Sequence, residues 1–96
     1  MSTRATIQIG QNIRLYRHCD GYPEGCGADL KEHVRAFDGE YFDIEQLATN
    51  LVRGGDYMVA DDEHGDEEYK YVISPESRKI SVYHPENLDW ELLRTL

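Results

Sequence analysis

The order of strand-type and helix-type segments constrains the fold of this chain more than any other feature of the sequence. Runs in which apolar and polar residues alternate stand near both ends, and apolar residues recur at helical spacing between them. Gly10 and Gln11 separate the first two runs, which predicts an N-terminal hairpin, and short turn-type segments join the last three runs into a meander. The predicted strands are Thr6–Ile9, Asn12–His18, Tyr57–Asp61, Glu68–Ser74 and Arg78–Tyr83.

Two amphipathic helices are predicted in the middle of the chain, the first from Asp29 to Phe37 and the second from Asp43 to Arg53. Each begins with Asp and has Glu or Gln three positions later, which is the spacing of a capping box. Gly54 and Gly55 follow the second helix and are expected to stop it. In the last segment, ENLDWELLRTL, leucines at four-residue spacing predict a short C-terminal helix, which packs on its own sheet or on a second copy of the chain.

These elements predict an α+β fold in a single domain spanning residues 1–96. We expect a small antiparallel sheet of about five strands, formed by the N-terminal hairpin and the C-terminal meander. Two helices would cover one face of that sheet. A chain of 96 residues has material for one hydrophobic core only, and the pattern leaves the strand order open.

The charge of the chain is strongly negative, with 19 Asp and Glu against 10 Lys and Arg. In residues 61–68, DDEHGDEE, six of eight residues are acidic, and a field of this sign repels phosphate. Direct nucleic-acid binding is therefore not expected, and a protein with a basic surface is the expected partner. The alternative is a solvated hairpin tip that only keeps the protein soluble. The acidic residues proposed to bind protein are Asp61, Asp62, Glu63, Asp66, Glu67 and Glu68.

The address predicted for the chain is cytoplasmic. The N-terminal segment MSTRATIQIG has no apolar stretch of the kind found in secretory signals, and no run approaches the length of a membrane span. A reducing cytoplasm disfavours a disulfide between Cys19 and Cys26. These thiols could instead join His18 and His33 around zinc, but six residues separate the two cysteines, and structural zinc sites use closer pairs. We therefore predict no metal and no cofactor.

The segment YRHCDGYPEGCGADL could also be read as a catalytic loop, with His18 paired to Cys19 or to Asp20 and Glu24 as acid and base. Adjacent residues of a strand point to opposite faces, so His18 and Cys19 are poorly placed as a pair. No obvious oxyanion-binding loop accompanies them. We predict no catalytic residue and no enzymatic activity.

The same residues suit a rigid, shaped loop. Gly21, Gly25 and Gly27 permit positive φ, and Tyr22-Pro23 restrains the middle of the segment. Tyr22 and Glu24 would stand at the tip, where an ordered loop is well suited to bind protein. Tyrosines on the open face of the sheet, Tyr16 and Tyr83 among them, are a second candidate surface, for which a protein partner fits better than nucleic acid.

Two stretches, LYRHCDGYPEGCGADL and HGDEEYKYVI, give the chain a resemblance to a family of small uncharacterised bacteriophage and prophage proteins. Its members share a pattern close to YRHxDGYPEGxGxxL and a later HGDxEYxY, and the resemblance spans roughly Ile13 to Ile73. The family pattern does not require the two cysteines. The first signature corresponds to His18, Asp20, Gly21, Tyr22, Pro23, Gly25 and Gly27, and the second to His64, Gly65, Asp66, Glu68 and Tyr69. Because both stretches are predicted turns, we expect them to be neighbours in space.

The resemblance implies a phage protein that acts in the cytoplasm of a bacterial host. Small acidic phage proteins without catalytic motifs are often inhibitors of host machinery, anti-CRISPR proteins among them. The leading hypothesis is therefore an inhibitor, monomeric or homodimeric, that mimics DNA and binds a basic surface of a CRISPR effector complex. One alternative is an accessory module that binds protein through the glycine-rich loop. Another is a small enzyme or ligand-binding domain that uses His18, Asp20 and His64.

Overall fold

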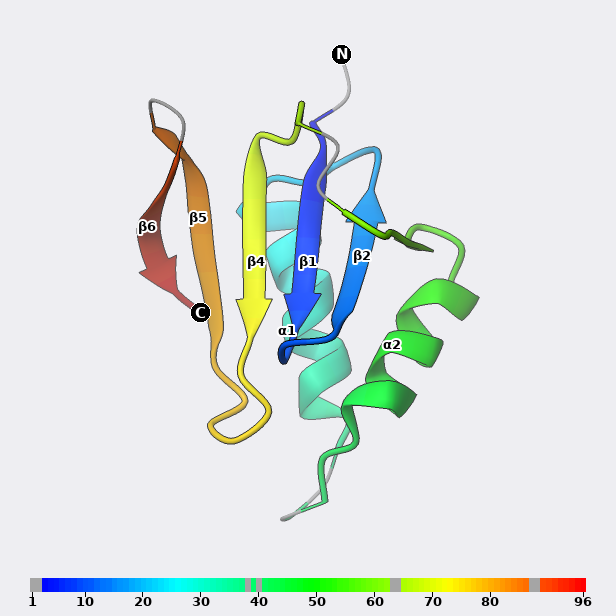
Figure 1. Cartoon of the computed structure of the whole chain (residues 1–96). Helices are drawn as coiled ribbons and strands as arrows, with labels where there is room; N and C mark the ends of the chain where they lie inside the picture. The colour runs from blue at the N-terminus through cyan, green and yellow to red at the C-terminus, as the bar shows by residue number, and fades with distance from the viewer. Residues whose placement is uncertain (1–2, 38, 40, 63–64, 87–88) are drawn as a thin grey trace.

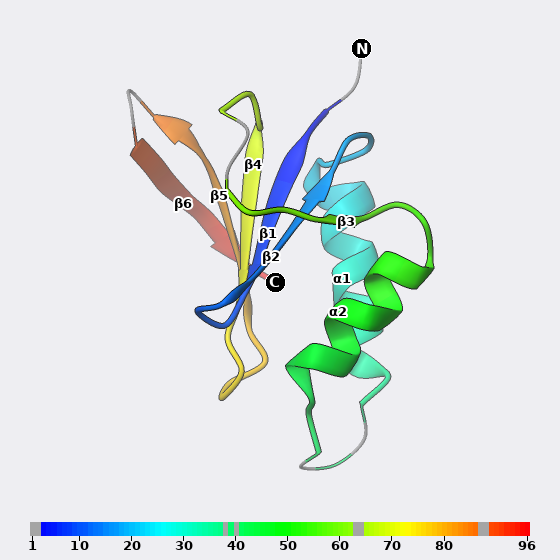
Figure 2. The ribbon, with the colours of Figure 1, turned by 45° about the vertical axis from the view of Figure 1, so that its right-hand side comes forward.

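The computed structural model describes residues 3–37, 39, 41–62, 65–86 and 89–96. Six strands form one sheet in the order β3-β2-β1-β4-β5-β6, and two helices pack on one of its faces (Figures 1 and 2). No helix of the described residues lies on the other face. The elements are β1 (Ala5–Ile9), β2 (Ile13–Arg17), a π-helical turn η1 (Pro23–Gly27), α1 (Ala28–Arg35), α2 (Ile44–Arg53), β3 (Met58–Val59), β4 (Tyr69–Ile73), β5 (Ile80–Glu86) and β6 (Asp89–Thr95).

The predicted N-terminal hairpin is confirmed. β1 and β2 pair antiparallel, with Ile7 opposite Leu15 and Ile9 opposite Ile13. Gly10 turns the chain between them at φ 63°, a conformation that glycine adopts without steric cost. The apolar side chains that the hairpin directs toward the helices belong to the hydrophobic core or pack against it.

Both central helices are also confirmed, although only one is capped as predicted. The Asp43 carboxylate accepts hydrogen bonds from the amides of Glu45 and Gln46 at 3.0 and 3.2 Å, which satisfies free donors at the start of α2. α1 follows directly on η1, so its N-cap position is Gly27 and its first residue is Ala28. The capping box predicted at Asp29 is wrong, because that carboxylate turns to other partners described below.

The predicted meander is wrong. β3 pairs with β2 at one edge of the sheet, and β4 lies parallel to β1, with Ile7 opposite Tyr71. Within the predicted meander, only the β4–β5 hairpin forms as expected. The sheet is mixed because β1 and β4 run parallel whereas the other neighbouring strands run antiparallel. Tyr71 and Ile73 are fully buried, and a place beside β1 in the centre of the sheet buries them better than an edge would. β3 and β4 are therefore separated in the sheet by β2 and β1, so they do not form the predicted hairpin (Figure 2).

The predicted C-terminal helix is also wrong, because residues 89–95 form β6, antiparallel to β5. The four-residue spacing of the leucines matches a helix, but Trp90 and Leu92 also alternate as they would in a strand. β6 pairs with the edge of β5 that would otherwise be open, and the Leu96 amide donates to the Ile80 carbonyl at 2.7 Å. Tertiary pairing therefore overrides the helical spacing in this segment.

The core lies between the sheet and the two helices. α1 contributes Leu30 and Val34, and α2 contributes Leu47 and Leu51. From the sheet come Ala5, Ile7, Ile9, Leu15, Tyr71, Ile73, Ile80 and Val82, which are 0–2% exposed. At the end of the sheet where β1 and β4 begin and β2 ends, the segment that contains η1 leaves β2 and residues 65–68 lead into β4 (Figure 1).

Candidate functional site

The signature loop, residues 18–27, is an ordered structure fastened to the sheet. The Gly21 amide donates to the Thr3 carbonyl at 2.8 Å, and the Gly21 carbonyl accepts from the Tyr71 hydroxyl at 2.6 Å. The Cys26 amide closes η1 by donating to the carbonyls of Asp20 and Tyr22 at 3.0 and 2.9 Å. β1 and β4 therefore fix the position of the loop.

The positive φ expected for the glycines of the signature loop is not observed. Gly21, Gly25 and Gly27 do not have positive φ; the left-handed residue of this loop is Asp20, at φ 56°. Gly21 and Gly25 are needed for close approach, because a Cβ atom would lie 2.8 Å from the Thr3 carbonyl oxygen at the first and 2.8 Å from the Asp20 carbonyl oxygen at the second. These contacts are with backbone, which cannot move aside as a flexible side chain can.

A hydrogen-bonded network under the loop was not predicted. The Tyr57 hydroxyl donates to the Asp29 carboxylate at 2.8 Å and accepts from the Arg17 guanidinium at 2.8 Å. Arg17 has a side chain only 11% exposed and lies over the Tyr57 ring, 5.0 Å from its centroid. The three residues come from β2, α1 and the segment before β3. No spacing in the sequence signals that they meet.

The two cysteines have different surroundings. Cys19 is exposed, whereas Cys26 is buried, with its Sγ 3.7 Å from the Tyr57 hydroxyl. Burial raises the pKa of the Cys26 thiol to about 12, so the thiol is protonated at neutral pH and is a poor nucleophile or metal ligand. His33 instead contacts the Asp29 backbone carbonyl through Nδ1, at 2.9 Å. Among the residues that the structure describes, no group of three His, Cys, Asp or Glu side chains is arranged to hold a metal ion.

The two signatures are neighbours, as predicted, and Arg4 joins them. Its guanidinium pairs with Asp66 at 2.7 Å and lies 3.4 Å from His18 Nδ1, which the Tyr16 hydroxyl also approaches at 3.1 Å. The Arg4 carbonyl accepts from the Glu68 amide at 2.9 Å. Burial, and secondarily the charge of Asp66, raise the pKa of Tyr16. His64, the first residue of the second signature, lies outside the described residues.

The predicted acidic site is divided by the structure. Exposed members are Asp61, Asp62, Asp66 and Glu68, whereas Glu67 is only 6% exposed and accepts from the Gly65 amide at 2.7 Å. Its carboxylate binds the Gly65 amide, so Glu67 exposes less of its side chain than the other described acids of this segment. Glu63 lies outside the described residues.

Two arginines, Arg4 just before β1 and Arg14 of β2, contact described residues of the acidic segment. Arg4 pairs with Asp66, and Arg14 lies 3.6 Å from the Asp62 carboxylate and 3.3 Å from the Asp61 carbonyl oxygen. Asp62 stays 87% exposed despite this contact. Part of the negative charge is thus neutralised from within the chain.

The signature loop and residues 66–68 both lie beside Thr3 and Arg4, at the end of the sheet where β1 begins. Tyr22 is 38% exposed, and its hydroxyl donates to Asp20 at 3.2 Å. Glu24, the other predicted contact residue, is exposed, as are Asp20 and His18. Pro23 is the first residue of η1. An amide hydrogen at this position would have no hydrogen-bond partner within the turn, so proline is well suited to it. This end of the molecule therefore combines exposed carboxylates with one exposed aromatic ring.

The tyrosines predicted on the open face lie there, but they do not form a stacking platform. The registers place Tyr16, Thr6, Lys70 and Tyr83 in one row across β2, β1, β4 and β5. Tyr16 is only 5% exposed, at one side of this row. On the other side Lys70 Nζ lies 5.8 Å from the centroid of the Trp90 ring, so its charge already has an aromatic neighbour.

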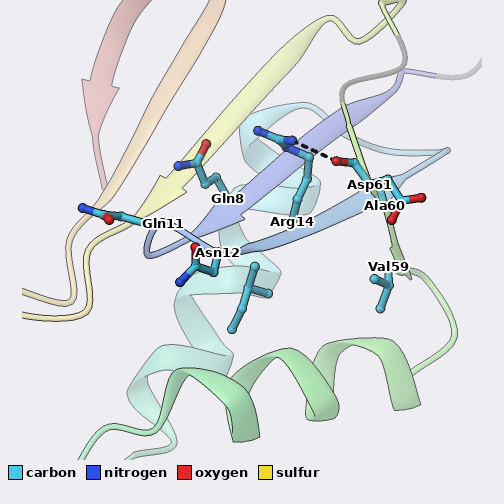
Figure 3. A pocket seen from close by; sticks show the side chains of 8 residues that line it. Gln8, Gln11, Asn12, Arg14, Val59, Ala60 and Asp61 are labelled. Atoms are coloured by element: carbon cyan, nitrogen blue, oxygen red, sulfur yellow. Dashed lines mark hydrogen bonds between the residues drawn. The ribbon is translucent and has the colours of Figure 1, made fainter.

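A polar pocket of about 330 Å³ lies on the open face, between the β1–β2 hairpin and the chain that follows β3 (Figure 3). Arg14 and Asp61 meet at its rim, and the Arg14 Nε is buried without a hydrogen-bond partner. Its lining consists of Gln8, Gln11, Asn12, Ile13, Arg14, Val59, Ala60 and Asp61.

Comparison with known proteins adds no assignment to this geometry. No protein-family model, no curated protein and no solved structure matches the chain. No helix in the described part of the chain is long and apolar enough to cross a membrane. The function must therefore be argued from the acidic end of the sheet and its loop.

Proposed function

We propose that this protein is a non-enzymatic inhibitor of the phage type, which binds a basic, nucleic-acid-binding surface of a host defence complex such as a CRISPR effector. The observation that carries the proposal is the acidic end of the sheet. Exposed carboxylates come from two separate segments: Asp20 and Glu24 in the signature loop, and Asp66 and Glu68 beside Arg4 where β1 begins, with Asp61 and Asp62 further along, beside Arg14 of β2. We name this surface the acidic end and define it as Asp20, Glu24, Asp61, Asp62, Asp66 and Glu68.

Fixed carboxylates suit a basic groove better than mobile ones. A flexible acidic tail loses conformational entropy when it docks, whereas carboxylates on an ordered backbone lose less. DNA carries one phosphate per ~1.7 Å of axis over both strands, so several carboxylates on one small surface can replace a short stretch of phosphates. Each exposed charge contact contributes about 0.2–1 kcal/mol, and binding must therefore rest on several contacts together.

A test of binding should change acidic residues that do not also support the fold. Asp66 and Glu67 support the fold through Arg4 and the Gly65 amide, so their reversal would confuse binding with stability. Asp61, Asp62 and Glu68 are exposed, and Asp62 remains 87% exposed beside Arg14. The informative variant is the triple change Asp61→Lys, Asp62→Lys and Glu68→Lys. Its matched control reverses three exposed acids away from the acidic end, namely Glu32, Glu45 and Glu76.

The assay measures DNA binding by a panel of purified CRISPR effector complexes in a mobility-shift experiment, with increasing amounts of the protein. We expect the wild-type protein and the control triple variant to displace DNA from a susceptible effector, and the triple variant of the acidic end to fail. Displacement should also weaken steeply as salt rises. Equal displacement by the two triple variants would refute the proposal.

One observation favours a second candidate, an accessory module that binds protein through the signature loop. Tyr22 exposes an aromatic ring at the tip of a rigid loop, and aromatic residues on ordered loops are frequent binding hot spots. Under this alternative Tyr22→Ala abolishes partner binding, whereas the triple variant of the acidic end stays fully active and salt has little effect. The same assay therefore separates the two candidates.

A further inference from the structure

The outer edge of β6 is an unpaired strand edge with exposed leucines. β6 ends the sheet on one side, and Figures 1 and 2 show no described element beyond it. Leu92 is 52% exposed and Leu93 is 48% exposed. The opposite edge strand, β3, has only two residues, whereas β6 has seven. A long apolar edge offers backbone donors and acceptors to another strand, which proteins usually prevent by covering or charging the edge.

A bulge gives this edge a self-complementary charge pattern. Arg94 lies opposite Val82 and Leu92 lies opposite Tyr83, so Leu93 is an extra residue without a counterpart in β5. An extra residue shifts the alternation of faces by one position. Glu91 and Arg94 therefore lie on the same side of the sheet, although a regular strand would place residues three apart on opposite sides. Both residues are exposed.

We propose that β6 pairs antiparallel with β6 of a second copy, around a two-fold axis that passes between Leu92 and Leu93. In this register Glu91 of each copy faces Arg94 of the other, which forms two equivalent ion pairs on one side of the joined sheet. Trp90 faces Thr95 on the other side, and the four leucines meet at the centre. Residues that face each other across an antiparallel pair must lie on the same side of the sheet, and this register meets that requirement at both pairs.

The charges of β6 favour a second copy over an unrelated partner. The chain has a net charge of −9, which opposes contact between copies through most surfaces. β6 instead carries an acid and a base three positions apart, so two copies related by a two-fold axis are complementary at this edge. A single pair of strands buries less than a standard interface, which is roughly 1,600 Å², so the dimer is expected to be weak and concentration-dependent.

Sedimentation velocity of the full chain tests the proposal, at loading concentrations that span about two orders of magnitude. We expect the wild-type mass to rise from 11.1 kDa toward twice that value. Glu91→Arg and Arg94→Glu should each weaken self-association about tenfold, because each change places like charges opposite at two equivalent positions. The double variant, Glu91→Arg with Arg94→Glu, should restore it, because the pairs are then re-formed with exchanged charges.

Two further variants keep the test specific to this register. Val59→Lys changes the exposed apolar edge of β3 and should leave self-association unchanged, and Glu45→Arg repeats the charge change on an exposed position of α2. Circular dichroism checks that each variant is folded. A wild-type protein that stays monomeric at every concentration overturns the proposal. So does a double variant that fails to recover while folded, or a loss of association caused by Val59→Lys. The triple variant of the acidic end should still dimerise, so this result is independent of the proposed inhibition.

Discussion

Replacing Gly21 with alanine tests whether the signature loop owes its shape to close contact with β1. A methyl group at this position would lie 2.8 Å from the Thr3 carbonyl oxygen, 2.9 Å from the Ala5 Cβ and 3.0 Å from the Arg4 carbonyl carbon. The three atoms belong to the first residue of β1 and the two residues just before it, so neither side can move without disturbing the Gly21–Thr3 hydrogen bond.

The expected cost follows from overpacking a tight contact, which is about 1–3 kcal/mol, together with partial loss of a hydrogen bond worth about 1 kcal/mol. We expect Gly21→Ala to lower the free energy of unfolding by about 2–3 kcal/mol. A domain of this size has a total stability of about 5–15 kcal/mol, so the loss is a substantial part of it. The melting temperature should fall by about 8 °C or more, since each kcal/mol shifts it by about 4–8 °C in a domain of this size.

Urea unfolding followed by circular dichroism measures this effect, and Gly54→Ala is the matched control. Gly54 ends α2 at φ −67°, and a Cβ there would meet its nearest atom, the Leu51 carbonyl oxygen, at an ordinary 3.4 Å. The control should be neutral or more stable by up to about 1 kcal/mol, because alanine restricts the unfolded chain. If Gly21→Ala unfolds within 0.5 kcal/mol of the control, about the size of a neutral surface change, the close-contact argument is refuted.

Three other predictions concern the network and the thiol beneath the loop. Tyr57→Phe removes the hydroxyl that joins Arg17 to Asp29, and we expect the free energy of unfolding in urea to fall by about 1–3 kcal/mol. Tyr41→Phe is the control, because it removes an exposed hydroxyl and should lower this free energy by less than about 0.5 kcal/mol. Iodoacetamide followed by mass spectrometry should label Cys19 in the folded protein and Cys26 only after unfolding; simultaneous labelling of both would contradict the burial of Cys26. Burial raises the pKa of Cys26 from 9.0 to about 12, so the folded state holds this proton more tightly, and stability should fall as pH rises from about 9 toward 12. The fall contributed by this thiol is about 1.4 kcal/mol per pH unit and should disappear in Cys26→Ala.

Local patterns allowed prediction of the elements made by neighbouring residues. The β1–β2 hairpin needs only alternation and a turn, and α2 needs only helical spacing and the Asp43 cap. Both were predicted because the interactions that form them lie within a few positions in the sequence. The α+β class and the two helices on one face followed from these elements.

The pairings between distant residues were not predictable in the same way. Strand alternation gives the buried face of β4 but not its neighbour, so the parallel pairing of Ala5 with Tyr69 left no signal in the sequence. The spacing of Leu92 and Leu96 fits a helix as well as a strand, and only pairing with β5 decides between them. For this reason the meander and the C-terminal helix were both wrong.

The candidate site was predicted in part. The neighbouring positions of the two signatures were expected, but the residue that joins them, Arg4, was not singled out. Glu67 is buried and Glu68 is exposed, although the two acids are adjacent in the sequence. The number of acidic residues in a segment does not indicate which of them is buried, because burial depends on the path of the chain before β4. The glycines were expected to shape the loop through positive φ, whereas the observed cause is close contact, of Gly21 with Thr3 and of Gly25 with Asp20.

The parallel pairing of β1 with β4 has a consequence for synthesis of the chain. The β1–β2 hairpin can form as soon as its residues have been made, but the other edge of β1 has no partner until Tyr69–Ile73 follows. Folds that depend on such distant pairings form more slowly, and an apolar strand edge left open during that time can pair with other chains. A chain that ends before β4 would not be a smaller version of this domain. It would be a hairpin whose apolar edge remains open, and we expect it to aggregate as it is produced.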